Sequence, residues 1–349
     1  MIKQLIGLSL NILKSNFGEL KKPYKLNFCI TYKCNSRCKT CNIWKINAKN
    51  ELSIDEIKLF ADKNRYFKWI ELTGGEVFLR NDFVDIIKTF KASNPFIVTF
   101  PTNCLVNETL MLEKIKQILE LKIPRIAITL SLDGNEQMHD YIRGIPGNYK
   151  KTINMFKQLN KLKKNHKNLF FVFGYTISKY NQGHFNEAFE SIKQHIPDIK
   201  YNDFHINIAQ QSDNYYGNKE DNTLIPDKQI VLKELREIVK NREFEFSAIQ
   251  YIESKFLKKL IEFIETRKQP MKSKSLIDSL FIDAYGNIFP SIMWNMKIDN
   301  IKNINFDLNN IWAGKKADEI RKMIKENKEP VQWTSCEAYQ SIVSEIFKF

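Results

Sequence analysis

Three cysteines with the spacing C-x3-C-x2-C, at Cys34, Cys38 and Cys41, constrain the fold of this chain more than any other feature of its sequence. They follow Tyr24–Thr31 (YKLNFCIT), an aromatic and β-branched run that predicts a strand. The residues between the cysteines are polar, so the three thiols are predicted to lie on a loop at the carboxyl end of that strand. Three thiolates on one short loop can hold a metal cluster and leave one coordination position open.

Two other interpretations of the three cysteines are weaker. A structural zinc ion takes four ligands, commonly from two pairs of Cys or His residues, and the sequence offers no second pair. Buried thiols without a ligand would fit poorly beside polar neighbours such as Arg37 and Lys39. By contrast, Cys29 in the first strand and Cys104 after the third strand are expected to be ordinary buried side chains.

Strand and helix signals alternate from the first strand to residue 208. The expected strands are Tyr24–Thr31, Lys68–Leu72, Phe96–Phe100, Arg125–Leu132, Leu169–Ile177 and Asp203–Ile208. The helices expected between them are Ser53–Asn64, Phe83–Lys91, Glu108–Leu121, Tyr149–Lys163 and Phe185–His195. Repeated βα units predict parallel strands joined by right-handed crossovers. Six units predict an α/β fold, a partial (β/α)6 TIM-like barrel whose functional edge lies at the carboxyl ends of the strands.

The remainder of the chain is expected to add an α+β extension to this barrel. A turn-rich linker, two helices, a β-hairpin and a last helix pair are predicted at Gln210–Asp227, Asp227–Asn241, Ser247–Arg267, Ser279–Pro290, Leu308–Glu326 and Glu337–Phe347. The predicted division is an N-terminal helix at 1–22, the barrel at 23–210, the linker and helices at 211–268, and a C-terminal domain at 269–349.

Composition and charge narrow the compartment and the class of partner. Four of the six cysteines lie within thirteen positions, which favours a metal site in a reducing compartment over a disulfide framework and predicts a cytoplasmic protein. The net charge is 54 − 40 = +14, but the lysines are spread along the chain, so no nucleic-acid partner is expected. No apolar run reaches the ~18 residues that a membrane-spanning helix needs.

The first seventeen residues (MIKQLIGLSLNILKSNF) have apolar side chains near helical spacing and lack a convincing signal-peptide cleavage site. The favoured interpretation is a helix packed on the body of the protein. The alternative is a basic amphipathic helix that makes a peripheral contact with a membrane surface.

The cysteine loop after a first strand resembles the radical SAM superfamily, and downstream motifs support the resemblance. Thr73-Gly74-Gly75-Glu76 at the end of the second strand resembles the GGE motif of that family. Ser131-Leu132-Asp133-Gly134 closes the fourth strand, and a block from His139 to Gly147 follows. This block resembles the subgroup with a SPASM or Twitch extension, whose members modify peptides or make cofactors. The resemblance covers residues 24–210 closely and 270–340 loosely.

The resemblance implies a [4Fe–4S] cluster held by Cys34, Cys38 and Cys41, with one iron left to bind S-adenosylmethionine (SAM). In the family, one electron then cleaves the sulfonium bond, and the 5′-deoxyadenosyl radical abstracts a hydrogen atom from substrate. An electron donor such as flavodoxin or ferredoxin and a peptide or small-molecule substrate are the implied partners. A degenerate Fe–S protein that acts as a non-catalytic binding or partner subunit is the alternative.

Eight further residues are implied to bind the cofactor: Trp44, Thr73, Gly74, Gly75, Glu76, Ser131, Asp133 and Arg143. The two glycines let backbone approach the methionine moiety, and Glu76 can accept from its ammonium group. Ser131 and Asp133 can reach ribose or carboxylate, or can cap a helix instead. Arg143 can pair with the SAM carboxylate or order the Asp133 loop. Trp44 can shield the cluster or contact adenine, and can equally belong to the core.

The C-terminal part departs from the pattern of the subgroup, in which this extension holds auxiliary Fe–S clusters. After residue 104 the chain has only Cys336, and one thiolate cannot secure such a cluster. Ser291 and Gln332 occur where cysteines are expected. We therefore expect an extension that keeps its fold and lacks its auxiliary cluster.

Overall fold

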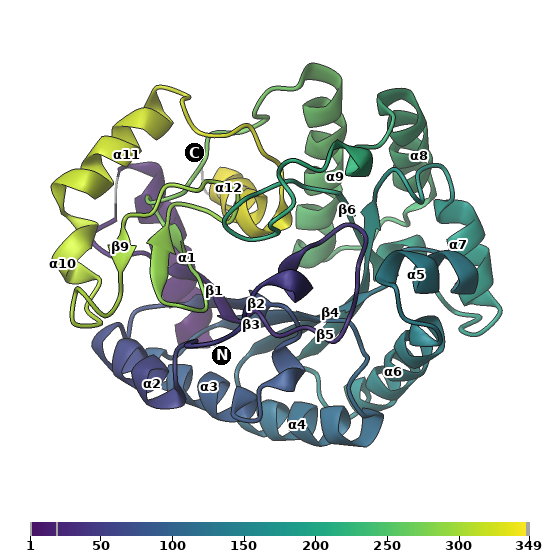
Figure 1. Cartoon of the computed structure of the whole chain (residues 1–349), viewed down its shortest axis with the longest axis horizontal. Coiled ribbons are helices and arrows are strands. Elements are labelled where there is room, and N and C mark those ends of the chain that lie inside the picture. Colours follow the sequence, from purple (N-terminus) through teal and green to yellow (C-terminus); the bar gives the residue numbers. More distant parts are fainter. Residues whose placement is uncertain (1, 19, 347–349) are drawn as a thin grey trace.

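Six parallel strands, β1 to β6, lie in the sheet in chain order, and three more strands extend the sheet beyond β1 (Figure 1). The structure is a computed structural model that describes residues 2–18 and 20–346. The sheet order is β6-β5-β4-β3-β2-β1-β7-β8-β9. The strands are β1 (Lys25–Thr31), β2 (Trp69–Gly74), β3 (Ile97–Thr102), β4 (Arg125–Ser131), β5 (Leu169–Ile177), β6 (Phe204–Ile208), β7 (Ser279–Ile282), β8 (Asn287–Phe289) and β9 (Asp299–Asn300).

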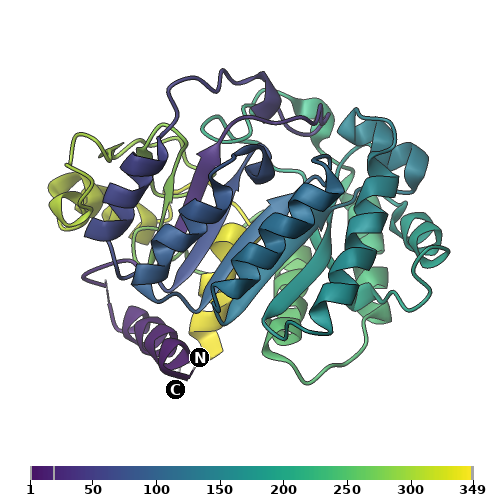
Figure 2. The ribbon, with the colours of Figure 1, turned by 90° about the horizontal axis from the view of Figure 1, so that it is seen from below.

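The helices surround the sheet, most of them on its outer face, whereas α12 lies on its inner face (Figures 1 and 2). They are α1 (Ile2–Asn16), α2 (Ile54–Lys63), α3 (Phe83–Phe90), α4 (Glu108–Glu120), α5 (Glu136–Arg143), α6 (Asn148–Lys163), α7 (Phe185–Lys193), α8 (Lys228–Asn241), α9 (Ala248–Thr266), α10 (Asn309–Trp312), α11 (Lys315–Lys325) and α12 (Ser335–Ile346). The predicted partial (β/α)6 barrel is confirmed: each expected strand and helix of residues 24–208 is present, with its ends shifted by a few residues.

The two faces of each barrel strand have different chemistry. In β1, Leu26, Phe28 and Ile30 belong to the main hydrophobic core, which the strands share with the outer helices. The intervening Lys25 and Asn27 bond α12 from the other face of the strand. Because side chains alternate along a strand, one face builds the apolar layer and the other lines the inside of the barrel.

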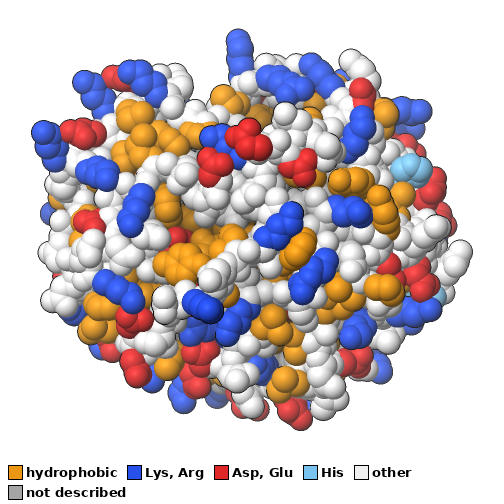
Figure 3. All heavy atoms as spheres, in the orientation of Figure 1, with side chains coloured by type: hydrophobic (Ala, Val, Ile, Leu, Met, Phe, Trp, Pro, Cys, Tyr) orange, Lys and Arg blue, Asp and Glu red, His pale blue; other side chains and the backbone are white. Residues whose placement is uncertain are grey.

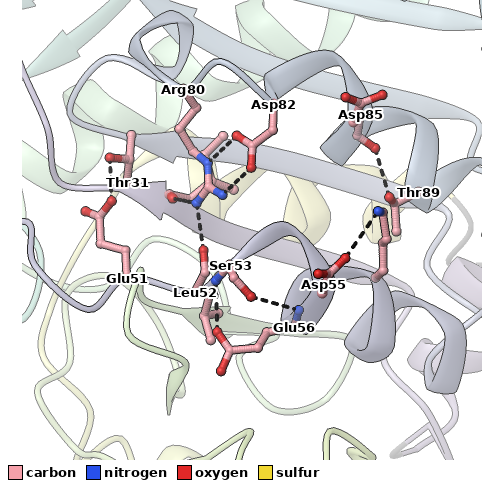
Figure 4. Close-up of polar contacts among 12 residues, drawn as sticks. Thr31, Glu51, Leu52, Ser53, Asp55, Glu56, Arg80, Asp82, Asp85 and Thr89 are labelled. Carbon is pink, nitrogen blue, oxygen red and sulfur yellow. Dashed lines mark hydrogen bonds and ion pairs between the residues drawn. The ribbon is translucent and has the colours of Figure 1, made fainter.

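Polar contacts fix the segment that leads from the cysteine loop to α2 (Figure 4). The Arg80 guanidinium donates to the carbonyl oxygens of Ile30, at 2.8 Å, and Leu52, at 3.0 Å. The Thr31 hydroxyl and the Tyr32 N–H both donate to the Glu51 carboxylate, at 2.9 and 2.5 Å. The cysteine loop therefore leaves and rejoins the barrel at points that are bonded to each other.

A capping box is present at the start of α2. The Ser53 hydroxyl accepts from the Glu56 N–H at 3.2 Å, and the Glu56 carboxylate accepts from the Ser53 N–H at 2.9 Å (Figure 4). These two bonds satisfy backbone donors that a helix start leaves without partners. α2 therefore begins directly after the long loop that carries the cysteines.

The C-terminal part continues the barrel sheet. β7 pairs in parallel with β1, and β7 and β8 form the predicted hairpin. Its turn contains Gly286 at φ +86°, a left-handed conformation that glycine adopts without strain. The helix expected over Leu308–Glu326 is instead two helices, α10 and α11, separated at Gly314. α12 covers most of the last predicted helix, whose final residue, 347, lies outside the described residues.

α12 lies against the inner face of β1. The buried Lys25 ammonium donates to the Cys336 carbonyl and, at 3.0 Å, to Gln340. Asn27 donates to the Glu337 carboxylate at 3.1 Å. Polar side chains of β1 thus have partners although they are buried, which offsets the cost of their desolvation. In residues 2–18 and 20–346, no helix has the length and apolar character to cross a bilayer.

Candidate active site

A pocket of about 280 Å³ opens at the carboxyl ends of the barrel strands. All three motif cysteines line it, together with Trp44, Thr73, Gly74, Gly75, Ser131 and Arg143. These nine residues come from four separate places in the sequence. Two predicted site residues, Glu76 and Asp133, do not line the pocket and are buried beside it.

The cysteine loop is held in place by backbone contacts with distant segments. The N–H groups of Arg37 and Lys39 donate to the carbonyl oxygens of Arg143 and Ile142, at 2.9 and 2.8 Å. The Asn42 N–H donates to the Tyr216 carbonyl at 2.9 Å. The end of α5 and the segment after β6 therefore position a loop that has no regular structure around its cysteines.

Hydrogen-bond donors lie near the sulfur atoms of Cys38 and Cys34. Cys38 Sγ lies 3.1 Å from the Ser36 hydroxyl and 3.7 Å from an Arg143 Nη1 donor. Cys34 Sγ lies 3.8 Å from the Asn103 amide nitrogen. Donors of this kind stabilise thiolate ligands and tune the potential of a bound Fe–S cluster. The donor set therefore fits a cluster with three cysteine ligands.

Burial favours the protonated form of the Cys34 and Cys41 thiols. Desolvation raises the pKa of Cys34 to about 11 and that of Cys41 to about 12. Iron binding must therefore displace protons from these thiols. Within the described residues no three His, Cys, Asp or Glu side chains converge on one point as ligands of a single ion do. A cluster differs from a single ion, because each thiolate binds a different iron atom.

Gly74 and Gly75 are required by the packing of the chain against itself. Gly74 has φ +139°, and a Cβ there would lie 2.1 Å from the Thr31 carbonyl oxygen. A Cβ on Gly75 would lie 2.2 Å from the Lys33 carbonyl oxygen. The N–H groups of Gly75 and Glu76 donate to these same two carbonyls, each at 2.8 Å. The glycines therefore press the end of β2 against the entry to the cysteine loop, and both face the pocket.

Glu76 organises the loops beneath the pocket. Its carboxylate accepts from the Asn103 N–H at 2.7 Å, the Thr102 hydroxyl at 3.0 Å and the Phe78 N–H at 3.2 Å. Burial raises the pKa of Glu76 to about 7. In this arrangement its oxygens bind the protein rather than point into the pocket, so its contact with a SAM ammonium stays a prediction.

Arg143 connects the fourth strand to the cysteine loop. Its Nε lies 2.6 Å from Asp133 Oδ2, while Asp133 Oδ1 accepts from the Thr176 N–H at 3.1 Å. The nearby carboxylate of Asp133 and sulfur of Cys38 outweigh desolvation and raise the pKa of Arg143. Two roles were expected for Arg143: pairing with the SAM carboxylate or ordering the Asp133 loop. In the structure its guanidinium pairs with Asp133 and so orders that loop. A helix does follow this loop, but the side chain that caps it is Asn135.

Trp44 lies on η1 (Ile43–Lys45), directly after the last motif cysteine. Its indole N–H donates to the Cys38 carbonyl at 3.4 Å, and the Arg37 guanidinium lies 5.1 Å from its ring centre. The side chain is half-buried and lines the pocket. Trp44 thus forms a wall of the pocket beside the three thiols, and its contact with a cluster or with adenine stays a prediction.

Several residues that line the pocket were not predicted from the sequence. Tyr215 comes from the segment predicted as a linker, and its hydroxyl bonds the Thr73 hydroxyl and, at 3.2 Å, the Gly74 N–H. The polar side chains Asn27, Glu71, His205 and Asn207 line the inside of the barrel and also reach the pocket. Strand alternation could have indicated the latter group, because each of them lies among outward-facing apolar residues.

The other cysteines fall into two groups. Cys29 and Cys104 are buried, as expected, and Cys104 has φ +60°, a conformation that favours glycine. Cys336 lines the pocket with the motif cysteines, and its Sγ donates to the Glu71 carboxylate at 2.8 Å. Cys336 therefore faces the barrel interior.

Solved structures with this architecture define the class of fold. Native anSMEcpe with bound AdoMet is similar with a TM-score of 0.60 and 14% identity, covering 93% of this chain and 96% of that chain. Streptococcus suis SuiB bound to S-adenosylmethionine is similar with a TM-score of 0.58 and 14% identity, covering 89% and 70% of the two chains. At such low identity the likeness shows the fold, a partial TIM barrel shared with radical SAM enzymes.

One segment of the chain is similar in sequence to a known family. Residues 28–192 match the model of the Radical SAM superfamily. GTP 3′,8-cyclase from Pectobacterium atrosepticum is 41% identical over 88 residues, which cover 23% of this chain and 26% of the cyclase. This chain therefore matches about a quarter of that curated relative. Residues 28–192 are therefore similar to the radical SAM domains of known enzymes.

Proposed function

We propose that this protein cleaves SAM reductively at a [4Fe–4S] cluster held by Cys34, Cys38 and Cys41, and abstracts a hydrogen atom from a polar substrate. One observation carries the proposal: the three thiols open onto the same pocket as Gly74, Gly75 and the polar barrel interior. When bound, the cluster supplies the electron that breaks the sulfonium bond. An external electron donor such as flavodoxin or ferredoxin would supply that electron in turn.

The protein's own contribution is to position the reactants and to exclude water. The backbone at Gly74 and Gly75 forms one wall of the pocket, and Trp44 forms another beside the cysteines. Arg143 and Asp133 fix the loop after β4, so that Ser131 is presented to the pocket by a rigid support. Fixed polar groups in a closed site orient a reactive cofactor without reorganising during the reaction.

The substrate side of the pocket is polar, which favours a peptide or a small polar molecule. Threonines of three neighbouring strands line it at Thr99, Thr129 and Thr176. The Asn27 side-chain oxygen is buried without a hydrogen-bond partner among the described residues. Similar folds include SuiB bound to the precursor peptide SuiA and anSMEcpe with the Kp18Cys peptide, which support a peptide. The cyclase relative, named for GTP, supports a small molecule.

We further propose that residues 269–349 are a SPASM/Twitch-like extension without an auxiliary cluster. Ser291 and Gln332, which occur where cysteines were expected, are both fully buried. The Gln332 side-chain amide donates to the Ser291 hydroxyl at 3.3 Å. A hydrogen-bonded polar pair at these two positions supports the replacement of metal ligands by an ordinary packed contact.

The test is anaerobic reconstitution with iron and sulfide, followed by iron counting and a SAM-cleavage assay with dithionite. We expect about four irons per chain and formation of 5′-deoxyadenosine. The Cys336→Ala variant should retain the same iron count. About eight irons would contradict the empty extension, and a cluster that does not cleave SAM would favour a non-catalytic partner subunit.

A further inference from the structure

Helix α1 has a broad apolar surface, and only part of it packs against the protein. Leu8 and Ile12 are buried in a small core with Tyr24, Phe96 and Val343. These contacts attach the helix to the amino end of the barrel, beside α12 (Figure 2). The favoured expectation, a helix packed on the body, therefore accounts for one side of α1 alone.

The adjoining side of the helix and the residue just after it carry an exposed row of large apolar side chains, which we call the apolar stripe: Ile2, Leu5, Ile6, Leu10 and Phe17. Their exposed fractions range from 46% for Leu5 to 85% for Phe17. At 100° per residue, the four helical members span about 140° of the circumference. Scattered single apolar residues are normal on a surface, but a continuous row on one helix face indicates a partner.

A cationic cleft adjoins the apolar stripe. It has a volume of about 810 Å³ and lies between α1 and the amino ends of β1 and β2. Five basic side chains line it, Lys14, Lys21, Lys22, Arg65 and Lys68, and no described lining residue is acidic. Phe17 belongs to both the stripe and the cleft, so the two surfaces are continuous.

Three of the four cleft lysines are available to a partner, whereas the Lys68 ammonium donates to the Ser93 carbonyl at 2.5 Å. Among the described residues, Lys14, Lys21 and Lys22 form no ion pair, and the Lys22 ammonium lies 4.9 Å from the Tyr66 ring. The cysteine pocket lies at the other end of the barrel, where the carboxyl-end loops are, whereas α1 lies at the opposite edge (Figure 2). This surface is therefore separate from the site described above.

We propose that the apolar stripe and the cationic cleft together bind the surface of a bilayer that contains anionic lipids. The apolar side chains enter the boundary between headgroups and acyl chains, and the lysines meet the lipid phosphates. A 15-residue helix is about 22 Å long, enough to lie in the interface plane and too short to span the core. A second copy of the chain is a poorer partner, because facing clefts would bring like charges together.

The experiment measures sedimentation of the full chain with vesicles of phosphatidylcholine alone or with 30% phosphatidylglycerol, at low and high salt. We expect binding to the anionic vesicles that weakens with salt, and little binding to the neutral ones. The variant Leu5→Ser/Ile6→Ser/Leu10→Ser should bind at least ten-fold more weakly. The variant Lys14→Gln/Lys21→Gln/Lys22→Gln should bind about 100-fold more weakly.

Matched controls distinguish binding through this surface from a general effect of net charge on vesicle binding. Lys164→Gln/Lys268→Gln/Lys316→Gln removes the same charge from exposed positions elsewhere and should leave vesicle binding unchanged. Circular dichroism checks that each variant is folded. Equal binding to both vesicle types, or equal loss in the control, would overturn the proposal. So would a stable dimer of the native chain that the stripe variant turns into a monomer.

Discussion

The two ends of the barrel use the same strands to build opposite kinds of surface. At the carboxyl end, loops from distant parts of the chain fold inward and enclose a polar pocket around three thiols. At the amino end, one helix presents an apolar row outward beside a cleft of basic side chains. On the carboxyl-end face, basic side chains are spread among acidic ones instead of being gathered in one patch (Figure 3).

The difference shows that the candidate active site and the proposed membrane-binding surface can lie at opposite ends of one barrel. The pocket depends on contacts between residues far apart in the sequence. Examples are the hydrogen bond between the Tyr215 hydroxyl and β2 and the ion pair between Arg143 and Asp133. The outer surface depends on local helical periodicity within α1. Variants at one end should therefore leave the other end unchanged.

The largest effect is expected for Cys38→Ala, which removes one of the three sulfur ligands. We expect loss of the cluster absorption after reconstitution and a fall in 5′-deoxyadenosine formation of at least about 1,000-fold. Binding to anionic vesicles should be unchanged. Cys104→Ala, at a buried thiol that does not line the pocket, is the matched control and should retain both cluster and cleavage. Cleavage by Cys38→Ala at the native rate would refute the assigned ligand set.

The next effect is expected for Arg143→Met, which leaves the buried Asp133 carboxylate without its guanidinium partner. Removing one member of a buried ion pair costs about 3–5 kcal/mol, so the free energy of unfolding should fall by about that amount. Loss of the donor near Cys38 should also lower SAM cleavage by about 10- to 100-fold. Urea denaturation and the dithionite assay measure the two effects.

A second variant distinguishes positioning from general damage. Arg143→Met/Asp133→Leu removes both charges, so it should be more stable than Arg143→Met alone. Its SAM cleavage should stay low, because the end of α5 still lacks its link to β4. If the double variant recovers both stability and cleavage, then Arg143 acts only by neutralising Asp133.

The barrel was predictable from the sequence because its signals are local. Each strand is a short run of β-branched or aromatic residues, and the helices between them keep apolar spacing. Helix α5 was missed because it has eight residues and only two buried side chains, His139 and Ile142. The division of α10 from α11 at Gly314 was missed because apolar spacing continues across that position.

The candidate site was predictable only in part. Glycines and cysteines are informative in sequence because few other residues can replace them, and Gly74, Gly75 and the motif cysteines do line one pocket. Side chains that act through distant contacts carry no local pattern. Tyr215, from a polar segment, and Arg80, which joins β1 to the end of the cysteine loop, could not be recognised without the structure.

The smallest effect is expected at Glu337, on α12 between the two ends of the barrel. Its carboxylate accepts from Asn27, Ser275 and Gln340, but burial outweighs these bonds and the nearby Lys25 and raises its pKa to about 8. Between the ordinary pKa of 4.5 and pH 8, the folded protein keeps a proton that the unfolded chain releases. The free energy of unfolding should therefore fall as the pH rises through this window.

Glu337→Gln removes this titration while it keeps most of the hydrogen bonds. The slope of unfolding free energy against pH between pH 5 and 8 should become shallower by up to about 1.4 kcal/mol per pH unit. Glu319→Gln, at an exposed position on α11, should leave the slope as it is in the native chain. Because α12 supports both β1 and α1, an unchanged slope in Glu337→Gln would mean that the barrel interior admits water there. The two ends of the barrel would then be less separate than their contacts indicate.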